Sequence, residues 1–164
     1  MILIVVMLLG SIALIVFALV YKAKKNTKKQ RLRFEEHLAR TAAQHHLSWT
    51  TTEISRPRAL AWSADKKILF FMDFPDERGR HHVIDMNHVA HCRLSEEWST
   101  AEFVKGKKAE RHVTGLNLVL FMQDKNTIEL PLYREAEDGV LERARLSDKA
   151  AFWLQLIQPE LKNN

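Results

Sequence analysis

The hydrophobic pattern begins with an uninterrupted apolar run over the first 21 residues. Between Ile2 and Val20 there is no charged residue and no proline, and Ser11 is the one polar side chain. A helix of about 19 residues rises close to the ~30 Å thickness of a bilayer's hydrocarbon core. We therefore expect residues 1–21 to form a transmembrane helix. Its membrane-anchoring positions include Ile2, Leu9, Val16 and Val20, with Tyr21 as an interfacial aromatic residue.

The pattern favours an uncleaved anchor over a secretory signal peptide. No basic segment precedes the run, and the run is longer than the ~7–15 apolar residues of a signal peptide. It also ends in the bulky sequence Phe17–Tyr21, where a signal peptide has a small-x-small cleavage pattern.

The next stretch predicts a second helix beside the membrane. Residues 28–47 contain neither glycine nor proline and are rich in good helix formers. We expect an amphipathic helix over residues 34–48, after a basic segment over residues 22–33. Across residues 28–47 an apolar stripe contains Leu32, Ala39, Ala43 and Leu47, flanked by Phe34, Leu38 and Ala42.

Between Ala59 and Tyr133 the apolar residues recur at every second position, the spacing of a strand, and no longer at the spacing of a helix. The alternating sets are Ile68, Phe70, Met72 and Phe74; Ile84, Met86, Ala90, Cys92 and Leu94; Leu116, Leu118, Leu120 and Met122; and Ile128, Leu130 and Leu132. Short alternating strands separated by turn residues predict an antiparallel sheet with one buried face. We expect Phe70, Met72, Leu118 and Leu120 in the core. Residues 95–112 are charged and poorly periodic, so we interpret them as a strand end plus a mobile loop.

A third helix is predicted at the C-terminus, over about residues 147–158. Ser147 is a good N-cap and Pro159 ends the pattern. Trp153 and Ile157 lie at the centre of an apolar stripe that must be buried, and the sheet is the available partner. The predicted fold class is therefore α+β: a transmembrane helix, an amphipathic juxtamembrane helix, and a β-domain over residues 49–164 closed by a C-terminal helix.

The positive charge of the chain is concentrated beside the membrane. Seven of the 25 lysines and arginines precede the first acid, Glu35. The rest of the chain contains the other 18 lysines and arginines and all 20 acids, so it has a slight net negative charge. The seven are Lys22, Lys24, Lys25, Lys28, Lys29, Arg31 and Arg33. A basic stripe of this kind does not indicate a nucleic-acid-binding domain.

The same stripe predicts topology. By the positive-inside rule, the N-terminus lies outside and the C-terminal domain lies in the cytoplasm, at the plasma (inner) membrane. The seven cations either fix this topology alone or also face anionic lipid head groups. The single cysteine, Cys92, excludes an intrachain disulfide and is consistent with a reducing compartment.

Several antiparallel strands followed by one helix with a tryptophan on its buried face resemble the pleckstrin-homology-like (PH-like) superfold. More specifically, the layout is similar to small bacterial versions of this fold, some of which are anchored by an N-terminal membrane helix. Trp153 matches the tryptophan typical of the terminal helix. Phosphoinositide-binding members carry a Lys…Arg-x-Arg pattern, which Lys66, Lys67 and Arg78-Gly79-Arg80 match as text. Arg78 and Arg80 fall past Pro75, in a turn, so a partner-binding surface is the favoured interpretation.

No motif predicts catalysis, a cofactor or a small-molecule substrate. There is no Gly-x-Ser-x-Gly, no phosphate-binding glycine loop and no His-Glu-x-x-His. The histidines His81, His82, His88 and His91, with Cys92, raise a metal hypothesis. Positions one or three apart on a strand point to opposite faces, so His81 diverges from His82 and His88 diverges from His91. We therefore expect no metal site and a buried Cys92.

The sequence thus predicts a non-enzymatic, single-pass membrane protein whose domain is an interaction or scaffolding module with a protein partner. One alternative is an anionic-lipid sensor that uses the basic stripe and Lys105, Lys107 and Lys108. A second is a metal-binding domain that uses the strand histidines. Phe71 and Val119 should face away from the core set, either covered by the terminal helix or forming a docking patch.

Overall fold

The computed structural model describes residues 31–55, 57–73, 80–101 and 110–161, together with Phe17, Tyr21, Lys22 and Lys28. The chain divides into two compact units, Met1–His46 and Leu47–Asn164. Most of the predicted transmembrane helix (Ile2, Leu9, Val16 and Val20) lies outside the described residues, as do Lys24, Lys25 and Lys29 of the basic stripe. No helix in the described part of the chain has the length and the apolar composition needed to cross a membrane.

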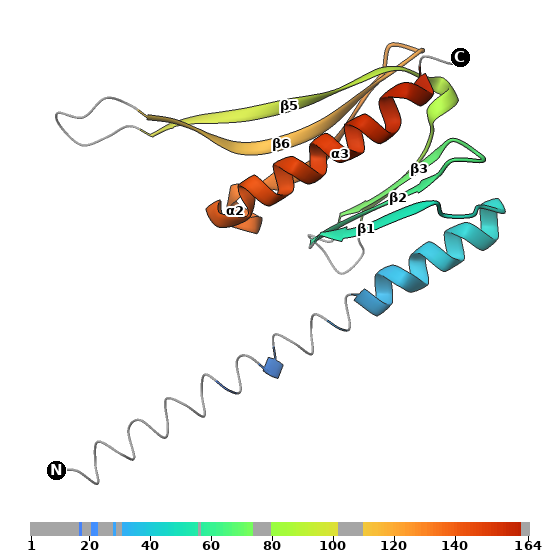
Figure 1. Cartoon of the computed structure of the whole chain (residues 1–164), viewed down its shortest axis with the longest axis horizontal. Helices are drawn as coiled ribbons and strands as arrows, with labels where there is room; N and C mark the ends of the chain where they lie inside the picture. Colours follow the sequence, from blue (N-terminus) through green and yellow to red (C-terminus); the bar gives the residue numbers. More distant parts are fainter. Residues whose placement is uncertain are drawn as a thin grey trace, which may run out of the picture. The chain divides into compact units, whose positions relative to one another are not determined.

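The first unit contains a helix over residues 31–45 (Figure 1), earlier at both ends than the predicted 34–48. It ends because His46 has a left-handed backbone (φ 51°), which breaks the helical path. The predicted stripe is wrong: Leu32 is 56% exposed and Ala39 and Ala43 are exposed, whereas Phe34 and Leu38 are buried. A spacing of four residues places these two side chains on one face.

The second unit contains two antiparallel sheets. The first has the order β1-β2-β3-β4, with β1 at Thr51–Ser55, β2 at Arg58–Ser63, β3 at Ile68–Asp73 and β4 at Arg80–Asp85. A short 3-10 helix, η1 (Met86–His88), leads into the second sheet, whose order is β5-β6-β7. Its strands are β5 at Val89–Ala101, β6 at Glu110–Met122 and β7 at Thr127–Arg134. The predicted antiparallel α+β architecture is therefore confirmed at this level.

β5 and β6 are longer than we predicted from residues 95–112, which we interpreted as a strand end plus a loop. Their pairing continues to Ala101 opposite Glu110, past a bulge at Glu97 and Trp98. This arm runs beyond the end of α3 (Figure 1), and Glu96, Glu97 and Trp98 on it are exposed. The predicted loop lysines Lys105, Lys107 and Lys108 lie outside the described residues, as do Phe74, Arg78 and Gly79.

The described part of the chain ends in α2 (Glu135–Asp138), the 3-10 helix η2 (Val140–Glu142) and α3 (Arg143–Leu161). α3 begins four residues before the predicted Ser147, because η2 leads directly into it and Arg143 already has a helical backbone. It also continues past Pro159 to Leu161. A proline in the last turn removes only one hydrogen bond, and the exposed Gln155 leaves the freed carbonyl open to water.

Side chains of α3 and of both sheets form one hydrophobic cluster, the main core, and α3 lies alongside the sheets (Figure 1). Leu118, Leu120, Trp153 and Ile157 lie in this core, and each is at most 1% exposed. Phe70 and Met72 are equally buried but lie on the opposite face of β3, where Phe70 packs 6.0 Å from the Trp49 ring centroid.

The expectation of a single buried face for β3 is therefore wrong. Leu69 and Phe71 belong to the main core, so both faces of this strand are buried. The continuous apolar sequence Ile68–Met72 is the pattern of a strand buried on both sides. Neither Phe71 (2% exposed) nor Val119 (4% exposed) offers a docking patch.

Candidate functional site

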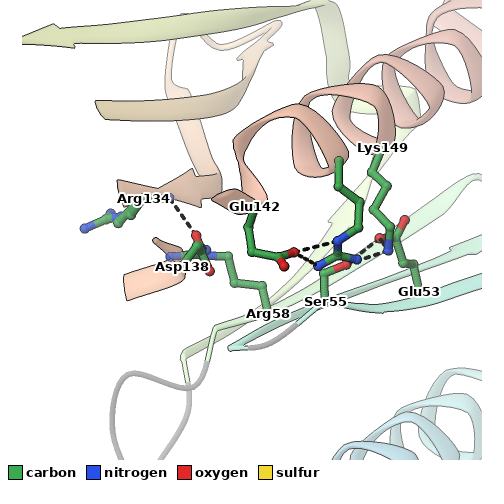
Figure 2. Close-up of polar contacts among 8 residues, drawn as sticks. Glu53, Ser55, Arg58, Arg134, Asp138, Glu142 and Lys149 are labelled. Atoms are coloured by element: carbon green, nitrogen blue, oxygen red, sulfur yellow. Dashed lines mark hydrogen bonds and ion pairs between the residues drawn. The ribbon is translucent and has the colours of Figure 1, made fainter. Parts of the chain in front are cut away.

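A buried arginine at the start of β2 connects the first sheet to α2. Arg58 is 2% exposed, and its Nη1 donates to Asp138 Oδ2 at 2.6 Å while its Nη2 donates to Glu137. Figure 2 shows Asp138 between this guanidinium and the backbone of Arg134, whose N–H donates to the same carboxylate at 2.7 Å. Charge-assisted bonds of this kind are the strong class of hydrogen bond. The Arg58 cluster (Arg58, Asp73, Glu137, Asp138) therefore fixes α2 on the sheet.

Asp73 completes this cluster at a longer range. Its Oδ1 lies 3.8 Å from Arg58 Nε, too far for a direct hydrogen bond. Burial raises the pKa of Asp73 above its ordinary value, although the positive charge of Arg58 acts in the opposite direction. Arg58 therefore bonds directly to Glu137 and Asp138 and acts on Asp73 by charge alone, which suits a structural role.

A second polar network attaches α3 to β1. Glu53 accepts hydrogen bonds from Lys149 Nζ at 2.5 Å, Ser55 Oγ at 2.6 Å and Trp153 Nε1 at 2.7 Å. Burial by itself would raise the pKa of Glu53, but these hydrogen bonds and the charge of Lys149 hold it below its ordinary value. The carboxylate is therefore ionised at neutral pH, and it accepts its three hydrogen bonds from side chains of the protein itself.

The same network brings a serine next to a lysine, a pairing that some hydrolases use as nucleophile and base. Lys149 Nζ donates to Ser55 Oγ at 2.8 Å (Figure 2). A general base must accept the proton of the hydroxyl, but Lys149 Nζ acts as a donor here and also donates to Glu53 at 2.5 Å. The Ser55 hydroxyl also donates to Glu53, so its proton is not directed at the lysine. This geometry does not support nucleophilic catalysis.

A groove lies where the open side of the first sheet meets the β6–β7 turn. Its volume is about 560 Å³, and it is lined by His82, Val83, Ile84, Asp85, His88, Met122, Gln123, Asp124 and Ile128. Alternate residues of a strand point to opposite faces, so a cavity that touches four consecutive residues of β4 lies along the strand's edge. We call this cavity the β4 groove.

Hydrogen bonds fix the shape of the β4 groove. The Asp85 carboxylate accepts from the Asn87 N–H at 2.9 Å and caps η1. Gln123 connects η1 to the β6–β7 turn, because its backbone N–H donates to the His88 carbonyl at 2.8 Å and its side chain donates to the Asn87 carbonyl at 2.9 Å. The groove is therefore formed by two connected turns and does not depend on a loose loop.

The backbone of β4 has an open edge beside this groove. Among the strands that the structure describes, β4 pairs with β3 alone. The Met86 N–H donates to the Lys67 carbonyl at 2.9 Å, which sets the alternation of the antiparallel ladder. In that alternation the main-chain groups of His82 and Ile84 bond to β3, whereas those of Val83 and Asp85 point outward.

The histidines do not gather into one cluster. His82 and His88 both line the groove, but His91 stacks on Phe121 with ring centroids 4.2 Å apart. Within the described ranges no three His, Cys, Asp or Glu side chains are arranged to hold a metal ion. Cys92 is buried, and burial raises the pKa of its thiol.

The described members of the basic stripe, Lys22, Lys28, Arg31 and Arg33, are exposed. Sequence reasoning missed Arg58, Glu53 and the β4 groove. A signal for Arg58 existed, because it is the lone charge of its strand and is followed by four apolar residues, Ala59–Trp62. No local pattern identified Glu53 or the groove, since both depend on residues distant in the chain.

In comparisons with known proteins, no family model, no curated protein and no solved structure matches this chain. The functional proposal therefore rests on the residues and geometry of the chain itself.

Proposed function

We propose that the chain is a single-pass, membrane-tethered binding module whose C-terminal domain faces the cytoplasm and has a PH-like fold. The apolar run over residues 2–20 and the basic stripe after it support the tether and its direction. The sheet orders of four and three strands, followed by a helix with the buried Trp153, support the PH-like assignment.

The domain acts by binding, and its binding site is the β4 groove. The observation that carries this proposal is the open edge of β4 beside a groove with a fixed shape. An extended segment of a partner protein adds to such an edge through main-chain hydrogen bonds, while its alternate side chains enter the adjacent pocket. The charged clusters around Arg58 and Glu53 hold helices on sheets, which supports a binding role over catalysis.

Photo-crosslinking in intact cells tests this proposal. A full-length His82→p-benzoylphenylalanine variant places the crosslinker in the groove, and we expect it to form a discrete adduct with a partner protein. The matched control is Leu141→p-benzoylphenylalanine, because Leu141 is 97% exposed and lies outside the groove.

The second variant adds Val83→Pro to the crosslinking chain. Proline removes the outward N–H of Val83, and an edge strand tolerates it because that N–H is not needed inside the sheet. The adduct at position 82 should disappear. An adduct that persists with Val83→Pro, or that forms at position 141 and not at position 82, would contradict binding along β4.

A further inference from the structure

The chemistry of the β4 groove also indicates what kind of segment it accepts. Two carboxylates from different elements stand at its rim, Asp85 at the end of β4 and Asp124 in the β6–β7 turn. Asp124 is exposed, and the Asp85 side chain is 41% exposed. The groove therefore presents two carboxylates to a ligand. Its other titratable side chains are His82 and His88, and His88 Nδ1 lies 3.4 Å from Asp85 Oδ2.

The floor of the groove is apolar. Ile84 is 3% exposed and belongs to the main core, and Met122 and Ile128 pack against that core while remaining partly exposed. A side chain that covers this floor removes apolar surface from water, which favours binding.

We infer that the β4 groove binds an extended segment of a partner protein in which lysine or arginine alternates with aliphatic side chains along the face that enters the groove. On an added strand, side chains two residues apart share a face and are separated by about 6.5–7 Å. A basic side chain can then reach a rim carboxylate while its neighbour on the same face covers the partly exposed Met122 and Ile128. This inference rests on the proposed function, since it names the segment that strand addition would accept.

Charge excludes the opposite kind of ligand. Nucleic acids and anionic lipid surfaces bind through neutralisation of phosphates by lysine and arginine. Asp85 and Asp124 would face those phosphates with like charge, so a cationic polypeptide is the complementary partner.

Two synthetic peptides test the inference on the full-length chain in phosphatidylcholine nanodiscs, a lipid surface with no net charge. The first is fluorescein-labelled Lys-Thr-Val-Thr-Lys-Thr-Val-Thr, which presents lysine and valine on one face of a strand and threonine on the other. The second replaces both lysines by glutamate. We expect fluorescence anisotropy to show that the lysine peptide binds about tenfold more tightly than the glutamate peptide.

Variants locate the effect. Asp85→Asn combined with Asp124→Asn keeps the side-chain oxygens that cap the turns but removes both charges, so the preference for lysine should be lost. Asp148→Asn is the matched control, because Asp148 is an exposed acid on α3 outside the groove, and the preference should remain. Val83→Pro should abolish binding of the lysine peptide, with circular dichroism used to show that the variant is folded.

The possible results separate the inference from the proposed function. If both peptides bind equally well, or the glutamate peptide binds better, and Val83→Pro weakens both, strand addition stands and the charge preference is wrong. If neither peptide binds, or if the lysine peptide binds independently of Val83→Pro, strand addition at β4 is itself overturned. Preference for the lysine peptide, lost in the double asparagine variant and kept in Asp148→Asn, supports the inference.

Discussion

Replacing Arg58 by methionine is expected to lower the free energy of unfolding by about 3–5 kcal/mol, because it leaves buried carboxylates without their cation. The Asp138 side chain is 1% exposed and loses the charge-assisted bond at 2.6 Å. Asp73, 12% exposed in its side chain, loses the nearby charge that partly offsets its burial. Methionine fills a similar volume, so the loss reports mainly on charge.

Arg145→Met is the matched control for this prediction. Arg145 pairs with Glu142 on the surface, where the two side chains are 54% and 44% exposed, so the same substitution should cost at most about 1 kcal/mol. Adding Asp138→Asn to Arg58→Met should recover part of the loss, because one stranded charge is removed. The loss should also shrink as the pH falls, because burial raises the pKa of Asp73 above its ordinary value and protonation removes its uncompensated charge.

Urea unfolding of the full chain in detergent micelles, followed by near-ultraviolet circular dichroism, measures these differences. A loss for Arg58→Met no larger than that for Arg145→Met would show that the Arg58 cluster does not hold α2 on the sheet.

Replacing Trp153 by alanine should cost about 3–5 kcal/mol, because it leaves a large cavity among the residues that connect α3 to both sheets. Trp153 is 1% exposed and lies in the main core. Phe152→Ala is the matched control: Phe152 is the next residue on the same helix but is 49% exposed, so its truncation should cost far less. Equal losses for the two variants would contradict the packing described here.

Trp153→Phe separates the hydrogen bond from the packing. Phenylalanine fills most of the volume but cannot donate to Glu53 Oε2, which accepts from Trp153 Nε1 at 2.7 Å. A carboxyl whose pKa is lowered in the folded state contributes stability above its unfolded pKa of about 4.3, and this contribution is lost as the pH falls through the folded value. Trp153→Phe should therefore be less stable than the wild type at pH 7, and the difference should shrink near pH 3.

The period of two along residues 59–133 predicted antiparallel strands, and the stripe around Trp153 predicted the helix that packs on them. Both predictions succeeded because burial of one face leaves a periodic mark in the sequence. The period could not show that β3 is buried on both faces, since Ile68–Met72 are all apolar and each alternate set looked like a core on its own.

Contacts between distant residues left no such mark. Arg58 and Asp138 are 80 positions apart, and Glu53 and Trp153 are 100 positions apart. The β4 groove depends on Gln123 reaching the His88 carbonyl across two turns, which no local pattern encodes. The candidate site therefore became visible only once the strands were placed.

The most direct measurement of the central claim is amide hydrogen exchange along β4, resolved by residue with nuclear magnetic resonance on the full-length chain. In the free protein the amides of His82 and Ile84 should exchange slowly, because they bond to β3, and those of Val83 and Asp85 should exchange quickly. Saturation with the lysine peptide should then slow exchange at Val83 and Asp85. Slow exchange at these two amides in the free chain, or fast exchange that persists with the peptide bound, would contradict an open β4 edge that accepts a partner strand.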